Sequence, residues 1–409
     1  MSLKSFWQTL KAAWGSIFAI LIGLIVAMIV LGASGYNPLY IFRGLEYSFF
    51  TKHGIINALA MATPLMLTAI TWAVGARAGV FNVGAEGTLM IGAVAAIAAG
   101  ALLKLPVGLH HLVVLAVAVA AGVLWTIPVA YLKIKRNVHE VVSTIMLNWV
   151  ASFLVSFLVV WPLRDPEWPM RSLKILPTAR FQPLVAGTNL TSVFFLSLAF
   201  TLVSYVLLWH TKTGQHIRAT GFNPDVARNC GINVPRSTIF AFGIGGAAAG
   251  LAGYALTAGL PPLWSISEKL GTLVGYGFNG ICVAAIGVNH PVGVIFAAIF
   301  FGGILSSRSY MQMFLGVAPE ITDVIAGVIV LILALPELSR MFLRWRRKKV
   351  IEKKVKRALT DSGPKEFNSP KPDYIENLFT IMRVVSEPAV VHHYEELWNK
   401  CEIRYSDMK

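Results

Sequence analysis

The sequence predicts an all-α membrane protein, a polytopic transmembrane helical bundle with about ten spans and with broken or re-entrant segments. Of the 409 residues, 56% are hydrophobic and only 13% are charged, and the mean hydropathy is +0.66. An ordinary soluble domain carries about 25% charged residues. Backbone groups in lipid must pair inside a helix or a closed barrel, and barrel-type alternation is absent from the apolar runs, so these runs are expected to be helices.

Ten apolar runs follow one another along the chain, each close to the roughly 20 residues that cross a bilayer. They are residues 14–33, 55–75, 79–103, 107–131, 143–162, 192–210, 239–259, 272–288, 291–307 and 321–336. The first run is longer than the core of a signal peptide and many runs follow it, which favours an uncleaved first helix. Small residues, as in 243–250, predict close packing between helices.

Basic residues predict the orientation of these spans. They gather in the N-terminal segment, in 133–136, in 212–236 and after Arg340, and ten crossings put all four segments on one face. The positive-inside rule makes that face cytoplasmic, with both termini. The opposite segment, 163–189, also contains four basic residues, but its four prolines indicate a long irregular external loop.

The composition changes after the last run, where residues 338–409 hold 16 Lys and Arg and 10 Asp and Glu. We therefore expect a transmembrane domain over 1–337 and a cytoplasmic basic tail over 338–409. A linker rich in Pro, Gly and Ser occupies 361–372, and a short amphipathic helix is plausible within 374–398. The net charge of +15 does not indicate nucleic-acid binding, because ten of the 35 Lys and Arg lie in 340–357.

Other classes of site have little support. Cys230, Cys282 and Cys401 lack metal-ligand spacing, so neither a metal nor a disulfide framework is expected, and no cofactor is predicted. The chain contains no Gly-Lys dipeptide and hence no phosphate-binding loop for ATP. Within the spans, no pair of carboxylates or histidine cluster has a spacing that suits catalysis, so we predict no catalytic residue and no enzyme.

Two interruptions of the apolar pattern are candidates for function. Residues 79–88 contain three glycines with Asn82 and Glu86, and 275–280 repeats the Phe-Asn pair as Phe278 and Asn279. A charge at the bilayer centre costs about 2.5–3.5 kcal/mol, so Glu86 should face protein or a water-filled cavity. Corresponding broken segments in two halves of a chain point to a midplane site.

Both interruptions have simpler explanations. Residues 79–87 could be a cytoplasmic loop with Glu86 exposed near Arg77, and 275–280 could pack helices through its glycines. Asn148, inside the fifth run, could line a path or only join two helices by hydrogen bonds.

These segments resemble the permease family of ATP-binding-cassette importers for nucleosides, ribose and branched-chain amino acids. The similarity covers most of 14–336, and its strongest patches are 81–87, 140–148, 217–224 with 227 and 231–234, and 275–280. The resemblance implies a membrane-spanning permease subunit in a bacterial-type cell (inner) membrane. Its solute would be small and polar, a nucleoside first and a simple sugar second.

The same resemblance implies a set of partners. They are a separate cytoplasmic ATPase subunit, a second permease subunit that is homologous or identical, an extracellular or periplasmic substrate-binding protein, and membrane lipid. Thr88, His139 and Asn279 depart from the family pattern, where glutamine, asparagine and aspartate are common, which leaves the exact solute open. The alternative is an ion-coupled secondary transporter or channel, which would work without ATP.

The resemblance also assigns a role to the polar segment 211–238, as the part that docks in the ATPase. Asn223 followed by Pro224 could start a short helix, because proline suits the first helical turn. The residues expected to couple the permease to the ATPase are Gly221, Asn223, Pro224, Asp225, Arg228 and Gly231. The other possibility is a solvated loop with ordinary charges.

Overall fold

The structure is a computed structural model, and it describes residues 22–261, 264–322, 324–325, 327–328, 371, 375–376, 379–380, 382–383 and 388–400. In this part of the chain the regular elements are helices, and the β pairing consists of two isolated bridges, Arg164 with Ser172 and Arg171 with Ser267. The predicted all-α class is therefore confirmed.

Seven helices are long and apolar enough to cross a membrane. They are α3 (Lys52–Arg77), α4 (Ala85–Leu102), α5 (Leu109–Arg136), α6 (Glu140–Val160), α7 (Val193–His210), α10 (Val234–Thr257) and α12 (Pro291–Leu315). Two shorter apolar helices are Ile22–Ala33 and α11 (Tyr276–Ile286). Nine of the ten predicted runs thus contain a helix, and most of the tenth lies outside the described residues, so the polytopic bundle is confirmed and the number ten is approximate.

The spanning helices divide into inner and outer ones. In α3, α4 and α10, 67–78% of the apolar window is buried inside the protein, whereas in α5, α6 and α7 the share is 22–28%. An apolar helix that is exposed along most of its surface is stable only against lipid, so the second group forms the outer layer.

Glycines allow the inner helices to approach closely. A Cβ added at Gly92 of α4 would lie 2.6 Å from the Cα of Gly250 in α10, and one at Gly250 would meet the carbonyl oxygen of Ala118 in α5. Only glycine fits where backbones touch in this way, as expected for helices that associate without a hydrophobic force between them. The small-residue stretch 243–250 therefore packs helices, as predicted.

Two further helices were not predicted. The helix α2 (Tyr40–Phe50) packs on α12 through stacked rings of Tyr47 and Tyr310, whose centroids are 4.3 Å apart. The helix α8 (Lys212–Phe222) occupies the first half of the segment that was expected to be a loop. Both have only 11 residues, and neither is part of a long apolar run, so the span pattern gave no signal for them.

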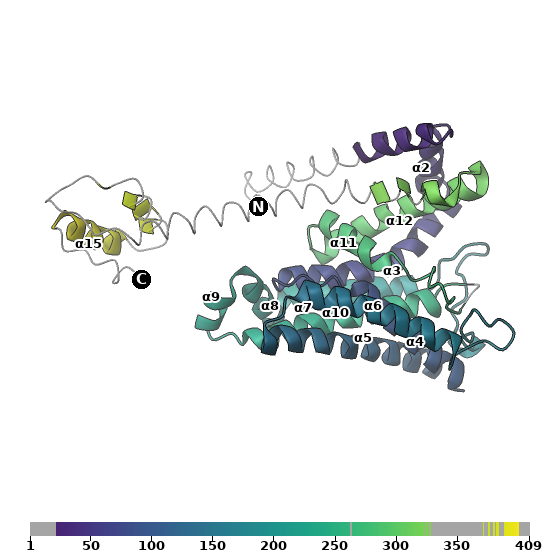
Figure 1. The fold of residues 1–409 in the computed structure, drawn as a ribbon, viewed down its shortest axis with the longest axis horizontal. Helices are drawn as coiled ribbons and strands as arrows, with labels where there is room; N and C mark the ends of the chain where they lie inside the picture. The colour runs from purple at the N-terminus through teal and green to yellow at the C-terminus, as the bar shows by residue number, and fades with distance from the viewer. Residues whose placement is uncertain are drawn as a thin grey trace. The chain divides into compact units, whose positions relative to one another are not determined.

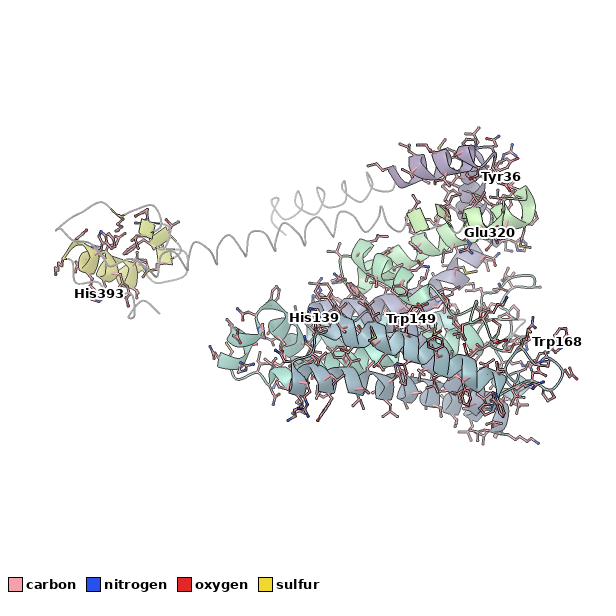
Figure 2. All side chains as sticks on the ribbon, viewed as in Figure 1. Tyr36, His139, Trp149, Trp168, Glu320 and His393 are labelled. Carbon is pink, nitrogen blue, oxygen red and sulfur yellow. The ribbon has the colours of Figure 1, made fainter. Side chains whose placement is uncertain are left out.

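The two ends of the bundle differ in structure. The helices α8 and α9 (Pro224–Asn229) lie at one end, and the connections between α6 and α7 lie at the other (Figure 1). Figure 2 shows His139 and Trp168, which flank α6, at these opposite ends. The α6–α7 connection contains a short 3₁₀ helix, η1 (Pro177–Ala179), and its Ile175 donates its N–H to Trp264 at 3.0 Å.

The chain divides into two compact units, residues 1–335 and 336–409. In the second unit, α15 (Pro388–Asn399) overlaps the segment 374–398, where a short helix was expected. Its buried cluster consists of Ile375, Phe379, Val391 and Trp398.

Candidate functional site

The segment between α3 and α4 is not helical and enters the bundle. After Gly79, which has φ +73°, Val80 donates its N–H to Gly75 at 3.0 Å, so the chain folds back beside the end of α3. The side chains that follow are buried, Asn82 at 3% and Glu86 at 4% exposure. This burial excludes the alternative of a solvated loop with Glu86 exposed.

Polar side chains from α6 hold this segment. Asn148 accepts a hydrogen bond from the N–H of Gly87 at 2.9 Å and donates to the carbonyl of Val83 at 3.0 Å. Asn82 accepts from the N–H of Gly84 at 3.0 Å. A helix that starts inside a bundle leaves its first N–H groups without helical partners, and these side chains supply some of the missing acceptors.

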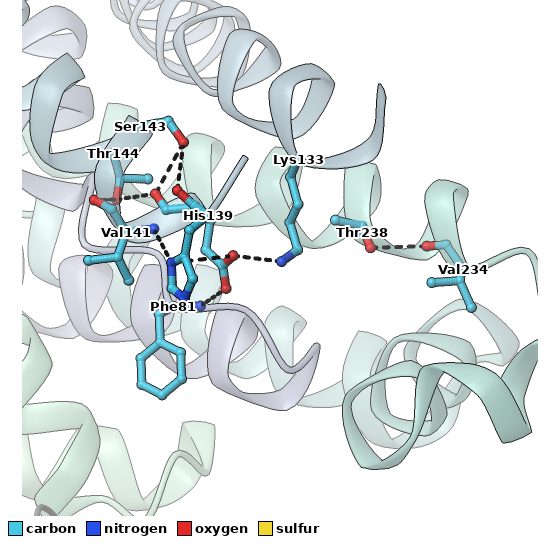
Figure 3. A network of polar contacts seen from close by, with 9 residues as sticks. Phe81, Lys133, His139, Val141, Ser143, Thr144, Val234 and Thr238 are labelled. Carbon is cyan, nitrogen blue, oxygen red and sulfur yellow. Dashed lines mark hydrogen bonds and ion pairs between the residues drawn. The ribbon is translucent and has the colours of Figure 1, made fainter. Parts of the chain in front are cut away.

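Glu140 anchors the start of the same segment. Its carboxylate accepts from the N–H of Phe81 at 3.1 Å and from the ammonium group of Lys133, in α5, at 2.6 Å (Figure 3). Glu140 belongs to one of the patches that resemble the permease family, but it was not among the predicted site residues. The sequence contained one signal for this role, because Glu140 is the first residue of α6 and follows Lys133 by seven residues, which allows the two to form an ion pair.

The second interruption precedes α11. Residues 264–275 are not helical, Gly275 has φ +95°, and α11 starts at Tyr276. At 11 residues, α11 is about 16 Å long, roughly half the thickness of the hydrocarbon core. The predicted span 272–288 is therefore a broken one.

The two interruptions meet at Glu86. Its carboxylate accepts hydrogen bonds from the backbone N–H groups of Gly275 and of Gly277, the latter at 2.6 Å. A Cβ added at Gly277 would lie 2.6 Å from the Cα of Glu86, so only glycine fits at this contact. The N-termini of α4 and α11 are thus joined through one buried carboxylate.

The other predicted pathway residues have different surroundings. Phe278 is 51% exposed on α11, and Asn279, next to it, is half-buried. Phe81 is 39% exposed at the other interruption. Of the five predicted residues, Asn82 and Glu86 lie inside the protein, whereas Asn148, Phe278 and Asn279 are partly accessible.

The predicted short helix after Asn223 is present as α9. The side chain of Asn223 caps it by accepting from the N–H groups of Asp225 at 2.9 Å and Val226 at 3.2 Å. Gly231, with φ +81°, follows the end of the helix. Asp225 and Arg228 form an exposed ion pair at 3.5 Å.

Apolar side chains are exposed at the same end of the bundle. Phe222 is 87% and Val226 is 56% exposed, whereas Ala227 is buried. Single exposed apolar side chains are ordinary, but here two lie on a projecting turn beside two charged ones.

Gly221, near the end of α8, touches the start of the first interruption. A Cβ added there would meet the carbonyl oxygen of Arg77 and lie 2.8 Å from the nitrogen of Gly79. Arg77 in turn donates from Nε to Asn289 and from Nη2 to Val288, both carbonyls at 2.9 Å, beyond the end of α11. The backbone contact therefore connects α8 with the start of the first interruption, and the Arg77 side chain connects that point with the turn after α11.

Within the described residues, no group of three or more His, Cys, Asp or Glu side chains is arranged to hold a metal ion. His110 instead lies with Nδ1 2.7 Å from the hydroxyl of Thr178, in the α6–α7 connection.

Comparison with known proteins gives one consistent family. A family model described as "Branched-chain amino acid transport system / permease component" matches residues 54–334. The guanosine ABC transporter permease protein NupP of Bacillus subtilis is 30% identical over 81% of this chain and 96% of its own length. The glucose ABC transporter permease protein TsgB13 of Haloferax volcanii is 29% identical over 82% of this chain and 90% of its own length.

A third similarity is of another kind. A stretch of 61 residues, 15% of this chain, is 51% identical to the tryptophan–tRNA ligase of Porphyromonas gingivalis and covers 19% of that protein. No solved structure matches the chain. The family match and the NupP similarity cover the helices that carry both interruptions, so the chain belongs to the branched-chain amino acid transport system permease family and is the permease subunit of an ATP-binding-cassette transporter.

Proposed function

We propose that this permease subunit imports a nucleoside, with a simple sugar as the second candidate. The observation that carries the proposal is the similarity to a guanosine permease over 96% of that protein's length. The nucleoside ABC transporter permease protein NupB of Lactococcus lactis, 27% identical over 80% of this chain, adds support. The glucose permease keeps the sugar as a candidate.

Uptake measurements test the solute. The chain is produced with its ATPase and binding protein in cells that lack nucleoside uptake, and entry of labelled guanosine and of labelled glucose is compared. Saturable, ATP-dependent guanosine entry is expected. Entry of glucose alone would replace the nucleoside by the sugar, and entry of either without ATP would favour the ion-coupled alternative.

The ATPase and the binding protein are the partners that the family implies, and we further propose a second permease subunit. Bacillus subtilis has two relatives of this chain, NupP and NupQ, which are 30% and 31% identical to it. Lactococcus lactis likewise has NupB and NupC. These pairs support a second permease subunit that is related to this chain and not identical to it. Purification of this chain with two different tags distinguishes the two cases, because the two tags are recovered together only if the complex contains two copies of it.

The substrate path is proposed to pass α11. Phe278 and Asn279 would contact the solute, and the partial accessibility of their side chains supports this role. Asn82, Glu86 and Asn148 would form the wall of the path by holding the ends of α4 and α11 in place.

The α8–α9 segment is proposed to dock in the ATPase. The exposed Val226, Asp225 and Arg228 of α9, which starts at Pro224 and is capped by Asn223, offer an apolar and charged surface together with Phe222, the last residue of α8. Gly221 would transmit a movement of α8 and α9 to the bundle, because it contacts the backbone where the first interruption starts. Nucleotide-driven closure of the ATPase would then shift α4 and α11 by rigid-body movement.

The tail is proposed to be a separate cytoplasmic unit, with the domain boundary at residue 337. The division of the chain at residue 335 supports this boundary. The stretch that resembles the ligase has 61 residues. It is too long for the 53 residues that precede the family match but fits in the 75 residues that follow the match, so we assign it to the tail. Limited proteolysis of inside-out vesicles should release a stable soluble fragment that contains Trp398; loss of the whole tail in small peptides would contradict this.

A further inference from the structure

The carboxyl group of Glu86 is buried, and within the described residues no basic side chain forms an ion pair with it. It is 4% exposed, and none of the ion pairs found in the described part of the chain involves it. Its hydrogen-bond donors are backbone N–H groups, those of Gly275, Gly277 and Phe278. A buried carboxylate without a counter-ion is stable only where its hydrogen-bond donors are strong ones.

The ends of two helices supply that strength. Gly275 is the N-cap residue of α11 and Gly277 lies in its first turn, and α11 has no capping side chain of its own. Glu86 itself lies in the first turn of α4. The N-terminus of a helix carries a partial positive charge of about half an elementary unit, so two such ends face the same carboxylate.

Helix N-termini of broken helices commonly bind anionic groups of the solute in membrane transporters. In this chain a protein side chain already fills that position. We propose that Glu86 is a resident anion that fixes the N-terminus of α11 and closes the site between the α4 and α11 N-termini to carboxylate- or phosphate-bearing solutes, so that the solute passing α11 is uncharged.

The inference about the solute rests on the proposed function, whereas the resident anion does not. The test therefore uses a measurement that needs no transported solute. Amide hydrogen exchange of the segment 270–280 is followed in the purified full-length chain in lipid nanodiscs, with sodium formate as the probe anion. Exchange there reports whether the N–H groups of Gly275 and Gly277 still have an acceptor.

Glu86→Ala should speed exchange in 270–280 by about tenfold or more, because hydrogen bonds to a charged group are lost. Glu86→Gln keeps an acceptor oxygen without the charge and should give an intermediate rate. Glu140→Ala is the matched control: it removes another buried carboxylate, whose hydrogen-bond donors are Phe81 and Lys133, and should leave exchange in 270–280 unchanged.

Formate provides the decisive comparison. It should restore slow exchange in Glu86→Ala, where the anion site is open, and have no effect on the wild-type chain, where Glu86 fills it. Equal restoration by neutral formamide would mean that Glu86 only fills space and would overturn the proposal, as would unchanged exchange in both Glu86 variants. If the exchange results hold but guanosine does not enter cells, the resident anion stands and the proposed solute fails.

Discussion

At the scale of single residues, polar side chains in the bundle form hydrogen bonds with backbone N–H groups. Glu86, Asn82, Asn148 and Glu140 each accept a hydrogen bond from a backbone N–H in or beside an interruption. A helix that starts within the bundle has unpaired N–H groups that lipid and apolar side chains cannot satisfy. From the sequence, Glu86 was expected to face protein or a water-filled cavity, and in the structure it faces the N-terminus of α11.

Asn148→Leu should destabilise the protein by about 1–3 kcal/mol, because the N–H of Gly87 and the carbonyl of Val83 lose their partner. Thermal unfolding in detergent, followed by intrinsic fluorescence, measures the effect. Trp149→Leu is the control, since the neighbouring side chain is 61% exposed and should tolerate the change. Equal unfolding temperatures of the Asn148 variant and the wild type would contradict this capping role.

At the scale of elements, three short helices, α8, α9 and α11, form the parts of the structure to which a function is proposed. The helix α11 cannot cross the bilayer alone, and α8 and α9 together occupy a segment that its polarity suggested was a loop. Capping side chains define the starts of α8 and α9: Thr211 accepts from the N–H of Gly214 at 3.1 Å, and Asn223 caps α9. Caps depend on local chemistry, which explains why α9 could be predicted from Asn223 and Pro224.

Gly221→Ala should uncouple transport, because the added methyl group would collide with the carbonyl oxygen of Arg77 and push α8 away from Gly79. We expect substrate-stimulated ATP hydrolysis to fall severalfold in the reconstituted transporter while the external binding protein still binds its solute. Gln215→Ala, at an exposed position of the same helix, is the control. Full stimulation in the Gly221 variant would remove this contact from the coupling route.

Arg228→Glu should weaken the docking of α9 without unfolding the permease. The residue is 66% exposed in its ion pair with Asp225, and exposed pairs contribute about 0–1 kcal/mol to stability. Co-purification of the ATPase should fall, with unchanged thermal unfolding of the permease. Arg136→Glu, an exposed change at the end of α5, provides the comparison; an equal loss there would indicate a general charge effect.

At the scale of the whole molecule, the bundle has two chemically different ends, which leads to a prediction of orientation. Met170, 71% exposed in the α6–α7 connection, should react with a membrane-impermeant maleimide from outside when changed to cysteine. The native Cys230, exposed after α9, should react only in opened cells. Labelling in the opposite pattern would reverse the topology and the assignment of α9 to the cytoplasm.

The sequence by itself determined the class of the protein, the position of nearly every span and the two interruptions, because apolar length and buried charge have costs that act locally along the chain. It also indicated that Glu86 must be shielded from lipid. Only the tertiary structure decided what shields it, since Gly275 lies 189 residues further along the chain. Pairing over that distance depends on how α11 packs against α3 and α4, and a local pattern of residues carries no information on that packing.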